Sequence, residues 1–290
     1  MTKKTTIRLL CLALLPACAL AHGRQAATPP ATAATAAISY TMPDAGDATR
    51  HIALQGALNA RDLGGLPGAH GPIPMDRFIR TADLARLTDT DKAALLKRGV
   101  ALDIDLRTTQ EASKAPDALA NDARFKYVRI SLLGDQPVDM AHLPPTLGAL
   151  YVRALADDQA QFKQVFETMA AQKNGAVLYH CSAGKDRTGM ISALLLSLAG
   201  VPRPAIEHNY AVSAYYLKPM MASPEVAAML KQHPAAAYLM GTPPAAIASF
   251  LDALQAKYGG AHSYLRQIGV SERDIDALQA RLGQPVARAG

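Results

Sequence analysis

The chain has 290 residues, of which 50% are hydrophobic and 19% are charged, which is enough for one full hydrophobic core. Its formal net charge of +6 includes Lys3, Lys4 and Arg8 of an N-terminal leader, and without these three residues it falls to +3. A charge of +3 is too weak to indicate a nucleic-acid-binding protein. The histidines show no metal-ligand spacing and no cofactor motif is present, so we expect neither a metal nor a cofactor.

Residues 1–21 are typical of a secretory signal peptide. Basic residues precede an apolar run from Leu9 to Leu20, which is too short to span a membrane comfortably. Ala19 to Ala21 supply small residues for cleavage before His22. We therefore expect an exported protein, either periplasmic or secreted.

A lipoprotein signal over residues 1–17 is the alternative. Cys18 would then become the lipidated first residue, and only in this case do we expect membrane association. Cys11 and Cys18 both belong to the leader, so Cys181 is the only thiol left in the folded domain. An exported domain with one thiol cannot rely on structural disulfides, and chemistry is therefore the better explanation for Cys181.

Residues 22–49 are rich in Ala, Thr and Pro and predict a flexible spacer, followed by one folded domain over 50–283 and a tail over 284–290. Within the domain, apolar strands alternate with amphipathic helices. This pattern predicts an α/β fold with a central, mostly parallel sheet flanked by helices. The expected strands span residues 51–55, 78–80, 100–106, 125–133 and 176–179. The expected helices span residues 89–98, 157–171, 187–199, 203–216, 245–257 and 272–281.

The most informative motif is His-Cys-Ser-Ala-Gly-Lys-Asp-Arg-Thr-Gly at residues 180–189. It lies between a short apolar strand and an apolar helix, so the loop sits at a helix N-terminus, where free N–H groups favour a phosphate and a thiolate. Cys181 is therefore expected to act as a thiolate nucleophile. Arg187 can hold two phosphoryl oxygens at once with its planar fork.

The other residues of this motif fit the same chemistry. The backbone amides around Ser182, Ala183 and Gly184 are expected to bind the phosphoryl group, because Gly184 lets the chain curl into an anion nest. Gly189 permits close approach of the helix, Thr188 can donate its hydroxyl to the cysteine sulfur, and His180 can brace the loop from behind.

Cys-x5-Arg with a preceding His and a following Thr resembles the phosphate loop of the protein tyrosine phosphatase superfamily. Asn59-Ala-Arg-Asp-Leu-Gly-Gly65, Asp105-Leu-Arg107 and Lys185-Asp186 resemble bacterial tyrosine and lipid phosphatases of the type secreted by mycobacteria and Listeria. The resemblance implies hydrolysis of phosphotyrosine through a phosphocysteine, with phosphoserine, phosphothreonine and phosphoinositides as further candidate substrates. The expected partner is thus a phosphorylated protein or a phosphoinositide, and the sequence does not indicate an oligomeric state.

The general acid is expected to be Asp186. The chain has no tryptophan, so the Trp-Pro-Asp loop of many tyrosine phosphatases is absent in its usual form, and the resemblance implies an acid within the phosphate loop. Asp135, in a loop after an expected strand, is the alternative, although it also fits an ordinary turn. Lys185 adds a second cation, which suits substrates with several phosphates or helps to hold a single one.

Supporting roles are expected for residues outside the loop. Asn59, Arg61 and Asp62 are expected to organise the site, with Asp62 paired to an arginine. Asp105 and Arg107 form either a solvated ion pair at a strand end or a pair that positions the substrate. Residues 217–242 contain four methionines, which either fill the core or form a movable lid, as in the phosphatases that the chain resembles.

Two other classes of function fit parts of the pattern. A module that binds phosphorylated ligands without turnover would not need Cys181, Asp186 and Arg187 together. An arsenate reductase needs further thiols, which the mature chain lacks, whereas an inositol polyphosphate phosphatase stays as an alternative.

Overall fold

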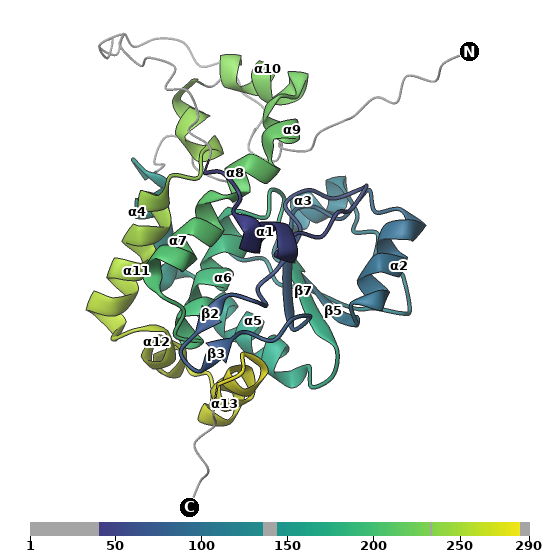
Figure 1. Ribbon diagram of the computed structural model, residues 1–290. Helices are drawn as coiled ribbons and strands as arrows, with labels where there is room; N and C mark the ends of the chain where they lie inside the picture. Colours follow the sequence, from purple (N-terminus) through teal and green to yellow (C-terminus); the bar gives the residue numbers. More distant parts are fainter. Residues whose placement is uncertain (1–40, 136–143, 233, 285–290) are drawn as a thin grey trace, which may run out of the picture.

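A five-stranded sheet forms the centre of the molecule. The computed structural model describes residues 41–135, 144–232 and 234–284 (Figure 1). The strands of the sheet lie in the order β1 (Arg61–Asp62), β4 (Phe78–Thr81), β7 (Ala176–His180), β5 (Val100–Asp105) and β6 (Lys126–Arg129). Only β1 is antiparallel to its neighbour, and the predicted mostly parallel α/β sheet is confirmed. A separate ribbon pairs β2 (Pro67–Gly68) with β3 (Gly71–Pro72).

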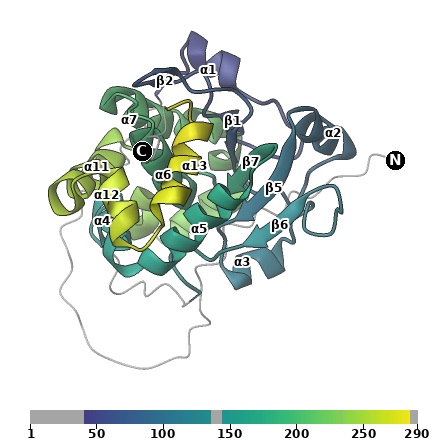
Figure 2. The same ribbon diagram turned by 90° about the horizontal axis from the view of Figure 1, so that it is seen from below.

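Helices lie on both sides of this sheet (Figure 2). The N-terminal part of the domain contains the helices α1 (Ala45–Arg50), α2 (Asp89–Lys97), α3 (Thr109–Lys114), α4 (Leu147–Asp157), α5 (Gln159–Ala171) and α6 (Asp186–Leu198). The C-terminal part contains α7 (Arg203–Ala211), α8 (Ser213–Tyr216), α9 (Lys218–Met221), α10 (Pro224–Gln232), the 3-10 helix η2 (Pro234–Met240), α11 (Pro244–Tyr258), α12 (Ala261–Gln267) and α13 (Glu272–Arg281). A large hydrophobic cluster joins one face of the sheet to α4–α7 and α11–α13, and a smaller one joins the other face to α2.

The register of three parallel strands determines where a site can form. His180 at the end of the central strand β7 pairs with Thr81 of β4 on one side and Asp105 of β5 on the other. The segments that follow these strands therefore meet at one edge of the sheet, which is where α/β proteins bind ligands. Helix α6 follows β7 and is buried on nearly all sides, as its apolar sequence predicts.

The strand expected at residues 51–55 is not formed. His51 makes one bridge to Arg61, and the backbone amides of Gln55 and Gly56 bind the Asp91 carboxylate at 2.7 and 2.9 Å instead of another strand. The segment expected at 125–133 forms a strand only over Lys126–Arg129, because its partner β5 ends at Asp105, opposite Arg129.

The helix expected over residues 203–216 is interrupted at Val212. Arg61 donates to the Asn209 carbonyl at 2.6 Å and Thr242 donates to the Ala211 carbonyl at 2.9 Å, so two backbone acceptors at the end of α7 bind side chains. Helix α1 begins inside the expected spacer, because a capping box formed by Asp44 and Asp47 starts it. The other expected helices agree with observed ones within two residues.

Among the described residues, no helix has the length and apolar character needed to cross a membrane.

Candidate active site

The carbonyl groups of the phosphate loop, residues 180–189, are bonded to the surrounding scaffold. Asn59 donates its side-chain amide to the Ala183 and Gly184 carbonyls at 3.1 and 3.0 Å. Arg80, fully buried, donates to the Gly184 carbonyl at 2.7 Å. The carbonyl of Ser182 accepts from the backbone of the segment after β4. Because these carbonyls face the scaffold, the loop amides are left for an anion.

Two glycines of the motif are required by close contacts. Gly184 has φ +65°, and a Cβ there would lie 2.3 Å from the Thr81 carbonyl oxygen. A Cβ at Gly189 would lie 3.0 Å from the Tyr210 ring. Both positions therefore serve the shape of the loop, as the sequence predicted.

Cys181 and Arg187 meet above the end of β7. Cys181 is 2% exposed and follows β7 directly, while Arg187 lies in the first turn of α6. Burial would lower the pKa of Arg187, but the hydrogen bonds to Glu111 and the nearby acidic groups, Cys181 among them, raise it. The Thr188 hydroxyl is buried and has no hydrogen-bond partner among the described residues, so the predicted bond to the cysteine sulfur is not formed in this structure.

Glu111 fixes the guanidinium of Arg187, and the sequence interpretation missed it. Its two oxygens accept from Arg187 Nη1 and Nη2 at 2.6 and 2.7 Å, and one also accepts from the Ser182 hydroxyl at 2.5 Å. Burial would raise the pKa of Glu111, but the hydrogen bonds and charge of Arg187 lower it. Glu111 is the third residue of α3, whose capping box Thr108-x-x-Glu111 could have been found in the sequence.

This grip leaves one edge of Arg187 for a ligand. A guanidinium has five N–H donors, and the end-on pair with Glu111 uses one from each terminal nitrogen. Nη1 also donates to the Leu106 carbonyl at 3.3 Å and Nη2 to the Ser182 hydroxyl at 3.5 Å, whereas the Nε–H has no hydrogen bond within the described residues. A phosphoryl group can bind the Nε–Nη2 edge in bidentate fashion if one of its oxygens replaces the Ser182 hydroxyl as the acceptor of Nη2.

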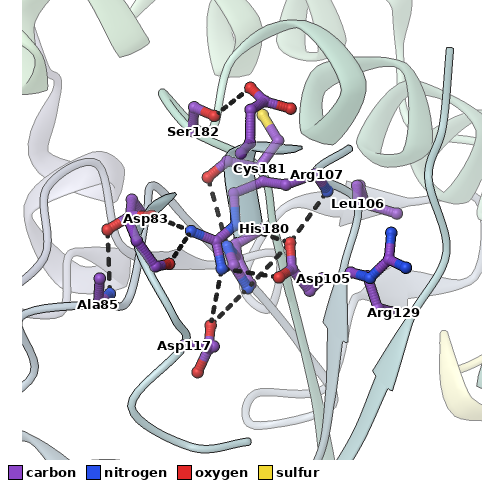
Figure 3. A network of polar contacts seen from close by, with 12 residues as sticks. Asp83, Ala85, Asp105, Leu106, Arg107, Asp117, Arg129, His180, Cys181 and Ser182 are labelled. Atoms are coloured by element: carbon purple, nitrogen blue, oxygen red, sulfur yellow. Dashed lines mark hydrogen bonds and ion pairs between the residues drawn. The ribbon is translucent and has the colours of Figure 1, made fainter. Parts of the chain in front are cut away.

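Behind the loop, His180 lies in a buried group of carboxylates (Figure 3). Its Nε2 is 3.0 Å from Asp117, 3.6 Å from Asp103 and 3.7 Å from Asp105, and its Nδ1 is 3.3 Å from the Cys181 carbonyl oxygen. Burial would lower the pKa of His180, but the charges of Asp105 and Asp103, with the hydrogen bond and charge of Asp117, raise it to about 10. The raised pKa favours the imidazolium form of His180, which lies behind the loop and contacts the Cys181 carbonyl.

The same group is one of two in the described residues whose ligand atoms could hold a metal ion. Asp103, Asp117 and His180 offer ligand atoms within 4.8 Å of one another, as do Asp44, Asp47 and His208. A protonated His180 cannot be a ligand. Burial raises the pKa of Asp103 well above its ordinary value, so a proton rather than an ion can neutralise the excess negative charge here.

We expect the stability of the protein to depend on pH through His180. The pKa is about 10 in the folded state and about 6.5 in an unfolded chain. The stabilisation is therefore complete below pH 6.5 and is lost as the pH rises from 6.5 through 10, a decrease of about 5 kcal/mol in unfolding free energy. Urea denaturation between pH 6 and 10 measures it. A His180→Gln variant should show a flatter profile, and equal slopes in both proteins would contradict this assignment.

Asp105 and Arg107 form a buried ion pair rather than a solvated one. Arg107 donates to both oxygens of Asp105 at 2.8 and 2.7 Å, and it also bonds Asp83 and the Ala115 carbonyl (Figure 3). Burial would raise the pKa of Asp105, but His180 and Arg107 lower it to about 2. The pair is held behind the loop, and its role is to position His180 and the segment after β5.

The Asn59 motif supports the loop as expected, whereas Asp62 acts further away. Arg61 is fully buried and bonds both oxygens of Asn59, which fixes the amide that holds the loop carbonyls. Asp62 accepts from the amides of Gly64 and Asp76, both at 2.7 Å, and lies 3.9 Å from Arg98. It shapes the turn after β1 and makes its expected arginine pair there.

Lys185 and Asp186 bind each other. The Lys185 ammonium donates to Asp186 Oδ1 at 2.8 Å and to the carbonyls of Leu239 and Gly241 at 2.7 and 3.1 Å. An ammonium has three N–H donors, and these three bonds engage all of them. In this conformation Lys185 ties the loop to the end of η2, and substrate binding by Lys185 stays a prediction.

Asp135 holds the N-terminus of α3. Its oxygens accept from the backbone amide and the hydroxyl of Thr109 at 2.6 and 2.8 Å, and its side chain is 47% exposed. This contact favours the turn interpretation of Asp135 over a catalytic one. It also steadies the short helix that carries Glu111.

The methionine-rich segment packs against the phosphate loop. Leu217, Met220 and Val226 form a small buried cluster that contacts Ala183 of the loop and Leu58. Helices α9 and α10 of this segment lie at the top in Figure 1, at the end of the molecule opposite α12 and α13. The segment therefore covers part of the loop, while its predicted movement as a lid stays a prediction.

Comparison with known proteins agrees with this geometry. The model of the tyrosine phosphatase family matches residues 52–284. The chain belongs to the tyrosine phosphatase family. It is 50% identical over 226 residues to a tyrosine-protein phosphatase of Nostoc commune, covering 73% of this chain and 76% of that protein.

More distant relatives were also found. The chain is 25% identical over 275 residues to the triple specificity protein phosphatase PtpB of Mycobacterium tuberculosis, covering 79% of this chain and 98% of that protein. Among solved structures, P. aeruginosa TpbA in complex with pTyr is 16% identical, with a TM-score of 0.32, and the match covers 72% of this chain and 88% of that one.

Proposed function

We propose that this phosphatase hydrolyses phosphotyrosine through a phosphocysteine on Cys181. The sulfur attacks phosphorus, an S–P bond forms, and the P–O bond to the tyrosyl oxygen breaks while Asp186 gives that oxygen a proton. Water then attacks phosphorus, the S–P bond breaks, and Asp186 takes a proton from the water. The observation that carries the proposal is the fixed Arg187 fork beside Cys181, in a loop whose carbonyls are bonded to the scaffold.

Phosphotyrosyl proteins are proposed as the main substrate class. A phosphotyrosine presents one dianion, which the loop amides and the free edge of Arg187 can hold. The extra phosphates of a phosphoinositide need further cations, and the Lys185 ammonium is engaged by three acceptors. The name of the mycobacterial relative, a triple specificity protein phosphatase, supports a substrate range wider than phosphotyrosine. Phosphoserine, phosphothreonine and phosphoinositides therefore stay in the proposal as further candidate substrates.

A panel of phosphopeptides and phosphoinositides tests this breadth. Phosphotyrosyl peptides should be turned over with the highest kcat/KM. Faster turnover of a phosphoinositide or an inositol polyphosphate would mean that this compound, and not a phosphotyrosyl protein, is the main substrate. Binding of all ligands without release of phosphate would indicate a binding module instead of an enzyme.

Replacement of the proposed acid should depend on the leaving group. We expect Asp186→Asn to lower kcat for an alkyl phosphate by about 10²- to 10⁴-fold, and much less for p-nitrophenyl phosphate, whose leaving group needs little protonation. The basic limb of the pH profile should disappear as well. Asp135→Asn is the control and should do neither, because Asp135 bonds the backbone amide and the hydroxyl of Thr109 at the start of α3. Reversed behaviour of the two variants would assign the acid to Asp135.

We also propose that the chain is exported. The proposal rests on the leader over residues 1–21, which lies outside the described residues. Mass spectrometry of the mature N-terminus tests it: a chain beginning at His22 indicates a soluble exported protein, a lipidated Cys18 indicates a membrane anchor, and a retained leader contradicts export.

A further inference from the structure

Two buried tyrosines reach the proposed acid from distant helices. Tyr151 of α4 and Tyr210 of α7 are at most 1% exposed. The Tyr151 hydroxyl bonds Oδ1 of Asp186 and lies 2.8 Å from the Tyr210 hydroxyl. The Asp186 side chain is 27% exposed, so it lies between this buried pair and solvent.

The direction of these hydrogen bonds follows from what each group can donate. A carboxylate oxygen only accepts, so the Tyr151 O–H donates to Asp186. The Tyr151 oxygen then accepts from the Tyr210 O–H. Burial and the charge of Asp186 raise the pKa of both phenols, so both keep their protons. The result is a donor chain from Tyr210 through Tyr151 to Asp186.

This chain makes the two carboxyl oxygens of Asp186 unequal. Oδ1 accepts from Tyr151 and from the Lys185 ammonium. Oδ2 has no hydrogen bond within the described residues. A carboxyl proton must sit on an oxygen that is not already saturated with donors, and Oδ2 is the one that meets this condition.

Shape alone does not account for the two hydroxyls. The rings of Tyr151 and Tyr210 pack edge to face at 6.0 Å, a contact that phenylalanines would also make. A buried hydroxyl is costly unless it is bonded, so the two O–H groups are best explained by the acceptor that they serve.

We propose that Tyr151 is a positioning residue that holds Oδ1 of Asp186, so that the proton passes to and from the substrate at Oδ2. The proposal rests on the role of Asp186 as the acid. As Oδ2 gives its proton to the leaving oxygen, negative charge grows on the carboxyl group, and the Tyr151 O–H and Lys185 stabilise it. Tyr151 therefore matters most for substrates whose leaving group needs a proton.

Tyr151→Phe tests this role. We expect kcat for an alkyl phosphate to fall about 10-fold or more, the strength of a hydrogen bond to a charged group, and kcat for p-nitrophenyl phosphate to change much less. The basic limb of the kcat profile should move to higher pH, because loss of a donor favours the protonated carboxyl. Tyr210→Phe should move both quantities in the same direction by less.

A matched control is Tyr264→Phe. Tyr264 is also fully buried and donates to the Leu155 carbonyl at 3.0 Å, but it does not contact Asp186. It should lower thermal stability without changing the leaving-group ratio or the pH limb. If Tyr151→Phe behaves like Tyr264→Phe, the positioning role is wrong.

The outcomes for Asp186→Asn separate this inference from the proposed function. If Asp186→Asn leaves the leaving-group ratio unchanged, the acid assignment itself fails. If it changes the ratio while Tyr151→Phe does not, only the positioning role fails. Should Tyr151→Phe not fold, Tyr210→Phe decides, because an unmoved basic limb in that variant would overturn the donor chain.

Discussion

Cys181→Ser is expected to lower turnover of a phosphotyrosyl peptide by at least about 1,000-fold while the variant still binds the peptide. A serine hydroxyl is a much weaker nucleophile than a thiolate at neutral pH, and the S–P intermediate cannot form. Binding should survive because Asn59, Arg80 and Glu111 hold the loop and Arg187 without help from the sulfur. Stopped-flow kinetics measures the turnover of the peptide, and titration calorimetry measures its binding.

Trapping of the intermediate gives the control for this prediction. Wild-type protein quenched in acid during turnover should carry phosphorus on Cys181, and Cys181→Ser should carry none. Turnover by the serine variant above background, or a phosphorylated residue other than Cys181 in the wild type, would contradict the covalent mechanism.

The phosphate loop could be predicted from sequence because its constraints are local. Residues 176–198 encode a strand, a glycine that must adopt positive φ, a helix start, and a cysteine separated from an arginine by five residues. The same holds for helix α6, whose apolar residues on every side require a buried position.

Residues that reach the loop from elsewhere could not be predicted in this way. Glu111, Arg80 and Tyr151 are far from the loop in sequence and approach it through the sheet register and the packing of α3 and α4. Glu111 is marked in the sequence only as the last residue of a capping box, and the neighbours of Arg80 and Tyr151 do not distinguish these two from other core residues. Asn59 was found only because it belongs to a recognisable motif, and its bonds to Ala183 and Gly184 explain why an amide is needed there.

The strand predicted at residues 51–55 was wrong because a tertiary contact overrides the local sequence pattern. Its alternating pattern fits a strand, but the Asp91 carboxylate takes the two amides of Gln55 and Gly56 that a neighbouring strand would have bonded. Local pattern therefore identifies which residues can pair in a sheet, while the acceptors that actually reach them depend on tertiary structure.

Arg187→Lys should lower kcat/KM by roughly 10³-fold, the second large effect that we expect. A lysine keeps the charge but has no planar fork, so it cannot bind Glu111 end-on and two phosphoryl oxygens along its side at the same time. Because charge on the phosphoryl oxygens is redistributed in the transition state, the loss should appear mainly in kcat. A variant with nearly unchanged kcat would mean that the loop amides alone stabilise the transferring group.

Glu111→Gln tests whether activity depends on the fixed orientation of the Arg187 guanidinium as well as on its positive charge. The amide keeps the size of Glu111 but offers one acceptor and places an NH2 group against a donor of Arg187, so the guanidinium should lose its fixed orientation. We expect kcat to fall by about 10²-fold, less than for Arg187→Lys, because the fork is still present but misplaced. Glu272→Gln, an exposed glutamate on α13, is the control and should leave kcat unchanged. If Glu111→Gln also leaves kcat unchanged, the loop itself fixes Arg187, and the contribution of α3 is confined to folding.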